Sequence, residues 1–234
     1  MERTTMATKE PLRLAEETLE RAINTEGFPD TFTLLGREWT LRRGVFPGTV
    51  TAATEVMASA LPYPVGGSFL EVGSGSGVIS VTAALRGVAS VTALDINTEA
   101  VANTEDNARL HGVESRVRSL HSDLFAALAP RERFDLVFWN VPWTWVPNDF
   151  SMSSRLHSAV FDPGYRAQAR FIAEAHDHLA PGGRVLIGTA DLADGALLER
   201  LAGDAGRRLR LLRRIRRIEV HRVMEYWLLE LLEA

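Results

Sequence analysis

The chain has 234 residues, a formal net charge of −4 and no cysteine. This length is enough for one sizeable core with a short N-terminal extension. The absence of cysteine excludes a disulfide framework, thiolate metal sites and a cysteine nucleophile, and the acidic balance does not favour a protein whose main role is to hold nucleic acid.

The first 49 residues are predicted to form a helix, a hairpin and a loop. Apolar residues at helical spacing predict a helix over Leu12–Ile23. Strand-like segments at Thr31–Leu35 and Glu38–Arg42 flank Gly36, which indicates a hairpin turn, and a loop follows over Gly44–Thr49. The N-terminal segment does not resemble a secretory signal, and no apolar run is long enough to cross a membrane. We therefore expect a cytoplasmic protein without membrane contact.

Segments with strand and helix character alternate from residue 50 onwards. Helices are predicted over Val50–Leu61, Val78–Leu85, Thr98–Leu110, Tyr165–Leu179 and Gly195–Leu201. Strands are predicted over Ser68–Val72, Ser90–Leu94, Val117–His121, Phe134–Trp139 and Arg184–Gly188, with an antiparallel edge pair at Leu209–Ile218 and Val223–Leu232. This order predicts an α/β fold with a Rossmann-like, doubly wound, seven-stranded and mostly parallel sheet. We expect this domain to span residues 50–234, after an N-terminal part at residues 1–49.

A glycine-rich turn, Glu71-Val72-Gly73-Ser74-Gly75-Ser76-Gly77, joins the first strand of this alternation to its first helix. Glycine permits positive φ in a tight turn and lets a ligand approach the backbone without a Cβ in the way. Between a strand and a helix, such a turn is typical of sites for nucleotide-like cofactors. A loop that merely turns the chain is the alternative.

Acidic residues accompany this turn at the ends of successive strands. Asp95 ends the second strand, 22 residues after Gly73, and Asp123 follows the third strand. Open parallel sheets bind ligands at the carboxyl ends of their strands, so these carboxylates can accept hydrogen bonds from ribose hydroxyls and from an adenine amine. The Gly-x-Gly-x-Gly spacing and Asp123 argue against a nicotinamide-dependent oxidoreductase, whose turn has the spacing Gly-x-Gly-x-x-Gly.

Together these residues resemble the class I S-adenosylmethionine-dependent methyltransferases, over roughly Gly36 to the C-terminus. The resemblance implies S-adenosylmethionine as cofactor and S-adenosylhomocysteine as product. It also implies that the glycine turn borders the amino-acid part of the cofactor, that Asp95 binds the ribose and that Asp123 binds the adenine. The residues expected to contact the cofactor are Glu71, Gly73, Ser74, Gly75, Gly77, Asp95, Ile96, Asp123, Leu124 and Asn140.

The segment Asn140-Val141-Pro142-Trp143, at the end of the fourth strand, is expected to be catalytic. It resembles the Asn-Pro-Pro-Tyr motif of methyltransferases that act on planar nitrogens, including release-factor glutamine methyltransferases and base-modifying enzymes of RNA and DNA. The Asn140 side-chain oxygen and the Val141 carbonyl can accept hydrogen bonds from an amide or aromatic amine and orient its lone pair. Pro142 is expected to stiffen the turn and Trp143 to stack on a flat substrate. Val141 stands where proline is usual, which keeps the carbonyl but lowers the rigidity.

The segment from Gly36 to Thr49 resembles the hairpin and loop that precede the cofactor domain in the same enzymes, where the loop covers the active site. Phe161–Tyr165, followed by a predicted helix, resembles the loop after their motif. The loop from Thr144 to Gly164 is long for a compact domain, which is typical of functional loops. The substrate contacts expected in and next to these loops are Phe46, Thr49, Trp143, Trp145, His157 and Tyr165. His176 and His178 lie two residues apart on a predicted helix and point to different faces, so we expect no metal site.

The arginine-rich segment Arg207–Arg217 has two interpretations. It is either a strip that contacts RNA or a half-buried strand with a solvated face, and its alternation with apolar residues favours the second.

We expect an S-adenosylmethionine-dependent methyltransferase that methylates a nitrogen, in an amine, amide or guanidine-like group of a small molecule. The acidic balance and the short segment before the first loop favour this acceptor. The alternatives are a glutamine-type protein side chain, a nucleobase in RNA, and transfer to oxygen or carbon. A non-catalytic protein that binds S-adenosylmethionine is the alternative of another class, and Asn140 beside the glycine turn argues against it. The oligomeric state stays open.

Overall fold

The computed structural model describes residues 9–23, 30–152, 155–219 and 222–234. In these residues a seven-stranded sheet has the order β10-β11-β9-β6-β3-β4-β5. Its strands are β3 (Ser68–Val72), β4 (Ser90–Asp95), β5 (Val117–His121), β6 (Phe134–Asn140), β9 (Leu179–Ala190), β10 (Arg207–Glu219) and β11 (Arg222–Glu233). Strands β3, β4, β5, β6 and β9 pair in parallel, whereas β11 pairs antiparallel with both β9 and β10. The predicted fold class is confirmed.

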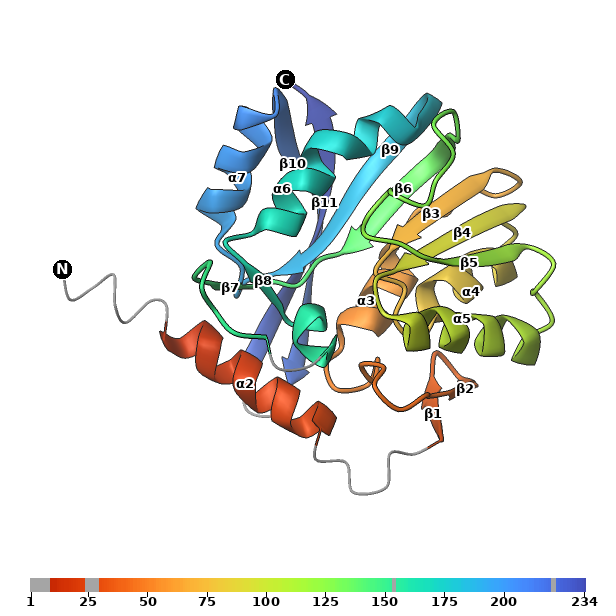
Figure 1. The fold of residues 1–234 in the computed structure, drawn as a ribbon, viewed down its shortest axis with the longest axis horizontal. Helices are drawn as coiled ribbons and strands as arrows, with labels where there is room; N and C mark the ends of the chain where they lie inside the picture. The colour runs from red at the N-terminus through yellow and green to blue at the C-terminus, as the bar shows by residue number, and fades with distance from the viewer. Residues whose placement is uncertain (1–8, 24–29, 153–154, 220–221) are drawn as a thin grey trace.

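Helices cover both faces of this sheet (Figure 1). One face carries α3 (Ala53–Ala60), α4 (Val78–Leu85) and α5 (Thr98–Leu110), and the other carries α6 (Arg166–Glu174), the short 3-10 helix η2 (Ala175–His178) and α7 (Gly195–Asp204). The central strand β6 contributes to both cores, because Leu136 and Phe138 face the first layer while Val137 and Trp139 face the second. A strand buried on both faces needs a continuous apolar run, which explains the composition of β6.

Short-range signals set the ends of several helices. The Asn97 side chain accepts a hydrogen bond of 3.1 Å from the Glu99 N–H and so caps the N-terminus of α5. The same helix ends before Gly112, whose φ of +66° ends the helix in the left-handed region. Asp194 caps α7 in the same way by accepting a hydrogen bond of 2.9 Å from the Leu197 N–H.

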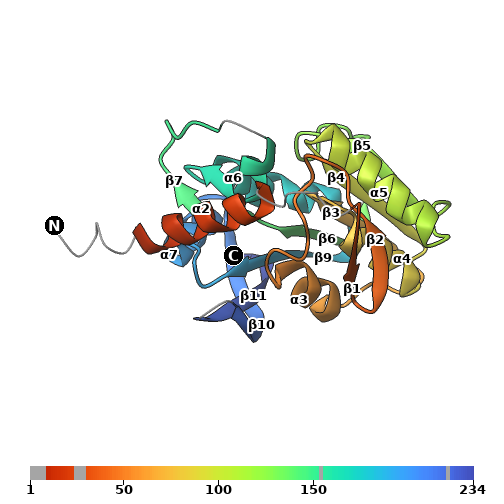
Figure 2. The same ribbon diagram turned by 90° about the horizontal axis from the view of Figure 1, so that it is seen from below.

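The N-terminal elements lie at the carboxyl edge of the sheet (Figure 2). They are α2 (Lys9–Ile23) and the hairpin of β1 (Thr31–Leu34) and β2 (Arg37–Thr40). Two buried asparagines of α5 bind the backbone that leaves this hairpin: Asn107 Oδ1 accepts from the Thr40 N–H and Asn103 Oδ1 from the Arg42 N–H, each at 2.8 Å. The hairpin is thereby fixed to the larger domain through its backbone.

The structure differs from the sequence-based expectation mainly between residues 144 and 179. The predicted helix Tyr165–Leu179 is shorter, because Tyr165 adopts a φ of +53° and α6 begins after it. Strand β9 begins at Leu179, which pairs with Phe134. The predicted long loop contains a short parallel pair, β7 (Thr144–Val146) and β8 (Phe161–Pro163), and a 3-10 helix, η1 (Arg155–Ala159).

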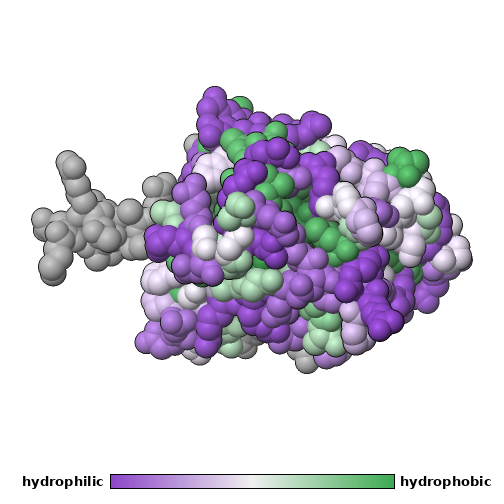
Figure 3. All heavy atoms as spheres, turned by 90° about the horizontal axis from the view of Figure 1, so that it is seen from above, coloured by the Kyte–Doolittle hydropathy of each residue, from purple (hydrophilic) through white to green (hydrophobic). Residues whose placement is uncertain are grey.

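The opposite edge of the molecule is covered mainly by hydrophilic residues, with hydrophobic residues visible in a band between them (Figure 3). In the described part of the chain, no helix combines the length and the apolar composition that crossing a membrane requires.

Candidate active site

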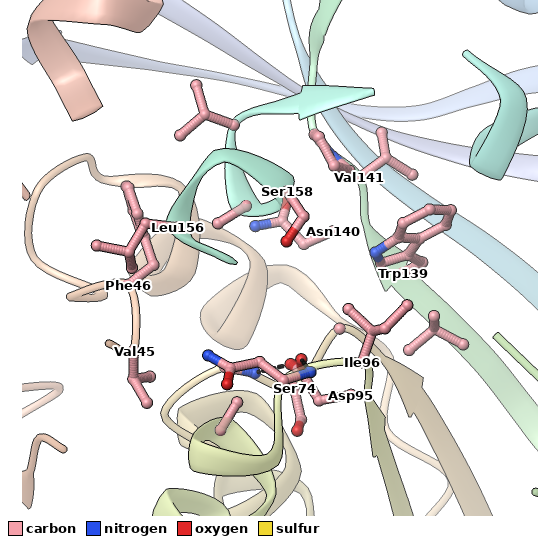
Figure 4. Close-up of a pocket in the computed structure, with 18 of the residues that line it drawn as sticks. Val45, Phe46, Ser74, Asp95, Ile96, Trp139, Asn140, Val141, Leu156 and Ser158 are labelled. Carbon is pink, nitrogen blue, oxygen red and sulfur yellow. Dashed lines mark hydrogen bonds between the residues drawn. The ribbon is translucent and has the colours of Figure 1, made fainter. Parts of the chain in front are cut away.

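A cavity of about 330 Å³ lies at the carboxyl ends of β3, β4 and β6. The cofactor half of its wall comes from the glycine turn and the segments after β4 and β5, and the acceptor half comes from residues 140–143, η1, β8 and the loop at 44–54. Figure 4 shows Ser74 and Asp95 on one side of this cavity and Asn140, Leu156 and Ser158 on the other. The two sequence patterns predicted to form one site therefore line one cavity.

The glycine turn has the backbone geometry that its sequence predicts. Gly73 and Gly75 have φ values of +66° and +55° and line the cavity together with Ser74. A Cβ on Gly73 would lie 2.8 Å from the indole Nε1 of Trp139. Glycine at 73 is therefore needed both for the turn and for the close approach of Trp139.

Gly77 has another role than the one expected for it. It does not line the cavity, and a Cβ at this position would lie 2.8 Å from the Thr104 Cα on α5. With a φ of +80°, Gly77 lets α4 begin while packed tightly against α5. The expected contact with a cofactor is thus not supported for Gly77, and its glycine is explained by helix packing.

Asp95 lies at the end of β4 and is 9% exposed. Its Oδ2 accepts a hydrogen bond of 2.8 Å from the Gly75 N–H, and its Oδ1 accepts one of the same length from the Asn97 N–H. Burial raises the pKa of Asp95, and these N–H donors oppose that rise by stabilising the carboxylate. Asp95 thus links the glycine turn to the segment after β4 and presents a carboxylate at the cavity wall.

Glu71 is 2% exposed and lies inside β3, where its Oε2 accepts a hydrogen bond from the Ser80 hydroxyl. Burial raises the pKa of Glu71 to about 8. Glu71 lines the cavity next to the glycine turn. A positively charged group bound there would stabilise the carboxylate form.

The segments after β4 and β5 add a flat apolar wall and one further acid. Ile96 is 53% exposed and Leu124 has a φ of +48°, and both line the cavity. Asp123 also lines it, but its carboxylate forms an ion pair with Arg170 of α6 at 2.9 Å. Asp123 thus lines the cavity as expected, but a bound adenine would have to share its carboxylate oxygens with Arg170.

Asn140 ends β6 and faces the cavity from the side opposite Asp95 (Figure 4). The next residue, Val141, donates its N–H to the Gly188 carbonyl at 3.0 Å and buries its side chain among apolar residues. A proline at 141 has no N–H and could not form this hydrogen bond. The valine that departs from the family motif therefore extends the pairing of β6 with β9 by one residue, which compensates for the rigidity expected to be lost.

The carbonyls of the next two residues are also fixed. Gln168 of α6 donates from Nε2 to the Pro142 carbonyl at 2.9 Å. The Tyr165 hydroxyl donates to the Trp143 carbonyl at 2.5 Å and accepts from the Asp194 N–H at 3.1 Å. The motif is thus held by hydrogen bonds from buried side chains that are distant in the sequence.

The structure does not place Tyr165 at the cavity, in contrast to the expectation that it contacts the substrate. Its side chain is completely buried, does not line the cavity and uses its hydroxyl to connect two loops. Three other expected contacts, Thr49, Trp145 and His157, also lie outside the cavity lining. Thr49 is exposed, and the His157 ring packs toward Phe161 instead.

Phe46 and Trp143 line the acceptor half as expected, and Trp143 also packs against Tyr226 with ring centroids 5.6 Å apart. Other residues of this half carry no sequence signal: Thr18 from α2, Leu156 and Ser158 from η1, and Val160. Trp139 and Asn97 also line the cavity without having been predicted, and their only sequence signal is that they are adjacent to the predicted residues Asn140 and Ile96.

The residues present fit S-adenosylmethionine. Of the described residues that line the cavity, the ionisable ones are Glu71, Asp95, Asp123 and Asp162, all acids. This set suits a cofactor with a sulfonium and an ammonium group, and the backbone N–H groups of the glycine turn can receive its carboxylate. Ile96 and Leu124 provide an apolar surface beside Asp123 on which a flat ring can lie.

Comparison with known proteins agrees with this fit. The family model "Methyltransferase small domain" matches residues 38–204. The release factor glutamine methyltransferase of Bordetella pertussis is 35% identical over 123 residues, which cover 50% of this chain and 45% of the relative. The ribosomal RNA small subunit methyltransferase C of Pasteurella multocida is 30% identical over 146 residues, 62% of this chain and 39% of the relative.

Among solved structures, a Thermus thermophilus 16S rRNA N2 G1207 methyltransferase in complex with AdoMet and guanosine has a TM-score of 0.59 at 21% identity. The match covers 87% of this chain and 50% of that one. The chain spans about half the length of the curated relatives it matches. The family match covers most of the chain, so the chain belongs to the methyltransferase small domain family of S-adenosylmethionine-dependent methyltransferases.

Proposed function

We propose that this chain transfers a methyl group from S-adenosylmethionine to a planar nitrogen, in an amide or an exocyclic amine. The observation that carries the proposal is the position of Asn140, which faces the cavity at the end of β6, opposite Asp95. Three hydrogen bonds fix the backbone after it, from the Val141 N–H and to the carbonyls of Pro142 and Trp143.

The roles of the residues follow from this geometry. Asp95, Asp123 and Glu71 would hold the cofactor, which supplies an electrophilic methyl group when bound. Asn140 Oδ1 would accept a hydrogen bond from the acceptor N–H and orient the nitrogen lone pair toward that methyl group. Because the motif backbone is already fixed, little reorganisation is needed when the acceptor enters. Phe46 and Trp143 would lie against the flat acceptor group.

The expected preference for a small-molecule acceptor is not supported by the comparisons. The names of the relatives point instead to a glutamine side chain of a protein and to ribosomal RNA. A glutamine amide and a guanine amine are both planar nitrogens, so either is compatible with Asn140.

The test is a transfer assay with S-adenosylmethionine that carries a radiolabelled methyl group, on a cell extract separated into RNA, protein and metabolite fractions. We expect label in a macromolecular fraction and a fall of about 10²–10³-fold with Asn140→Ala, the size typical for loss of one group that positions a reacting centre. Asp204→Ala on the exposed end of α7 is the control and should keep full transfer. Full transfer by Asn140→Ala would refute the proposal.

A further inference from the structure

The strands β10 and β11 form a ribbon whose charge opposes that of the rest of the chain. Between residues 207 and 233 there are eight arginines and four glutamates, a formal net charge of +4, whereas the whole chain carries −4. β10 lies at the end of the sheet order, so its outer edge has no strand neighbour among the described residues. Over 13 residues such a strand is about 40 Å long. The ribbon is thus a narrow, extended, basic surface on an acidic protein.

The arginines divide into a paired and an unpaired set. Arg207, Arg210, Arg214 and Arg216 form ion pairs with glutamates of β11. The exposed Arg208, Arg213 and Arg217 have no carboxylate within ion-pair distance in the part of the chain that the structure describes. These three pair in register with Leu232, Leu228 and Met224, whose side chains share one face of the strand. Three uncompensated guanidinium groups therefore follow one face of the ribbon, the face on the side of α3.

Apolar residues between these arginines anchor the strand. Leu212 and Ile215 pack against the core that contains α3, and the arginines alternate with them. Charged residues protect an edge strand from pairing with another chain, and a few charges of either sign suffice for that. Here all seven ionisable residues from Arg207 to Arg217 are arginines, which present planar donors suited to phosphate groups.

One end of the ribbon reaches the wall of the active-site cavity. Glu219, the last residue of β10, accepts a hydrogen bond of 2.8 Å from the Ala52 N–H, between the cavity-lining residues Thr51 and Ala53. Tyr226 of β11 packs against Trp143 of the motif. Figures 1 and 2 show the ribbon extending past the end of β9 toward α3. A chain bound along the arginines would thus be led to the cavity.

We propose that the Arg208–Arg213–Arg217 face of this ribbon binds the phosphates of unpaired RNA and delivers a base to the cavity. The inference rests on the proposed function and names its acceptor class. Among the described residues, only acidic ionisable groups line the cavity, so phosphate contacts have to be made outside it. An extended polyanion fits a line of charge better than a membrane, which presents a plane. In unpaired RNA the exocyclic amines are free to enter an enclosed site, whereas in duplex DNA they are paired.

The test is binding of a fluorescent, unstructured RNA of about 20 nucleotides, followed by anisotropy at several salt concentrations. The variant carries Arg208→Gln, Arg213→Gln and Arg217→Gln. We expect the negative slope of log K against log salt to become shallower by about 2, which corresponds to roughly hundredfold weaker binding near 0.1 M salt. The matched control carries Arg86→Gln, Arg131→Gln and Arg133→Gln, with the same change in charge on exposed residues outside the ribbon. It should bind within about threefold of the unmodified protein.

Three results would overturn the inference: no RNA binding by the unmodified protein, equal weakening by both triple variants, or competition by polyaspartate as effective as by RNA of equal charge. The last would assign the surface to an acidic protein partner. Calorimetric titration of S-adenosylmethionine into each variant checks the fold and should be unchanged. If the triple variant loses the cofactor, Arg213→Gln alone is used, with an expected slope change of about 0.7. Failure of the proposed function would instead appear as transfer that does not depend on Asn140.

Discussion

The two halves of the cavity are built in different ways. The cofactor half comes from one continuous stretch between Glu71 and Leu124. Its lining residues lie mainly at the ends of β3 and β4 and in the turns that follow β3, β4 and β5. The acceptor half is assembled from α2, the loop at 44–54, the end of β6, η1 and β8. Its geometry depends on hydrogen bonds between distant residues, such as that from Gln168 to the Pro142 carbonyl. The first half is thus built from neighbouring turns of one stretch, linked by Asp95, and the second from segments that lie far apart in the sequence.

The largest effect on cofactor affinity is expected from Asp95→Ala. The change removes a buried carboxylate that accepts hydrogen bonds from Gly75 and Asn97, and with it the acceptor proposed for the ribose. We expect the affinity for S-adenosylmethionine to fall by roughly a hundredfold, since charged hydrogen bonds of this kind contribute about 1.5–3 kcal/mol each. Calorimetric titration measures the loss, with Asp204→Ala as an exposed control. An unchanged dissociation constant would remove Asp95 from the cofactor site.

The next effect concerns the protonation of Glu71. Burial raises its pKa from 4.5 to about 8, so in this interval the folded protein holds a proton that the unfolded chain has released. The contribution of Glu71 to the free energy of unfolding therefore falls as the pH rises through this interval. Between pH of about 5.5 and 8 we expect the unmodified protein to lose roughly 2–3 kcal/mol more stability than Glu71→Gln. Urea unfolding at several pH values measures this, and parallel curves for the two proteins would show that Glu71 is ionised throughout.

The smallest effect is expected from Gln168→Leu, which tests the acceptor half alone. The change leaves the Pro142 carbonyl without its donor and loosens the segment after Asn140. We expect turnover to fall roughly tenfold, the effect of one lost hydrogen bond of about 1.4 kcal/mol, while the affinity for S-adenosylmethionine stays the same. Arg166→Gln on the exposed side of the same helix is the control. A loss of cofactor affinity instead of turnover would mean that the two halves are not independent.

The same contrast explains what the sequence could predict. The mostly parallel sheet, the turn at Gly73–Gly77 and the positions of Asp95, Asp123 and Asn140 follow from local patterns, because parallel strands bring their carboxyl ends to one edge. Tyr165 and Trp145 are expected in the acceptor site because they are aromatic and lie in or next to the long loop after the motif. Their true positions depend on the φ of Tyr165 and on the pairing of β7 with β8, which no local pattern indicates.

Titration of S-adenosylmethionine into Asn140→Ala tests the central claim most directly, namely that Asn140 acts on the acceptor in a cavity whose cofactor half is formed separately. We predict a dissociation constant within about threefold of the unmodified protein, in a variant that has lost about 10²–10³-fold in transfer. A loss of cofactor affinity as large as the loss of transfer would contradict this division and assign Asn140 to the cofactor.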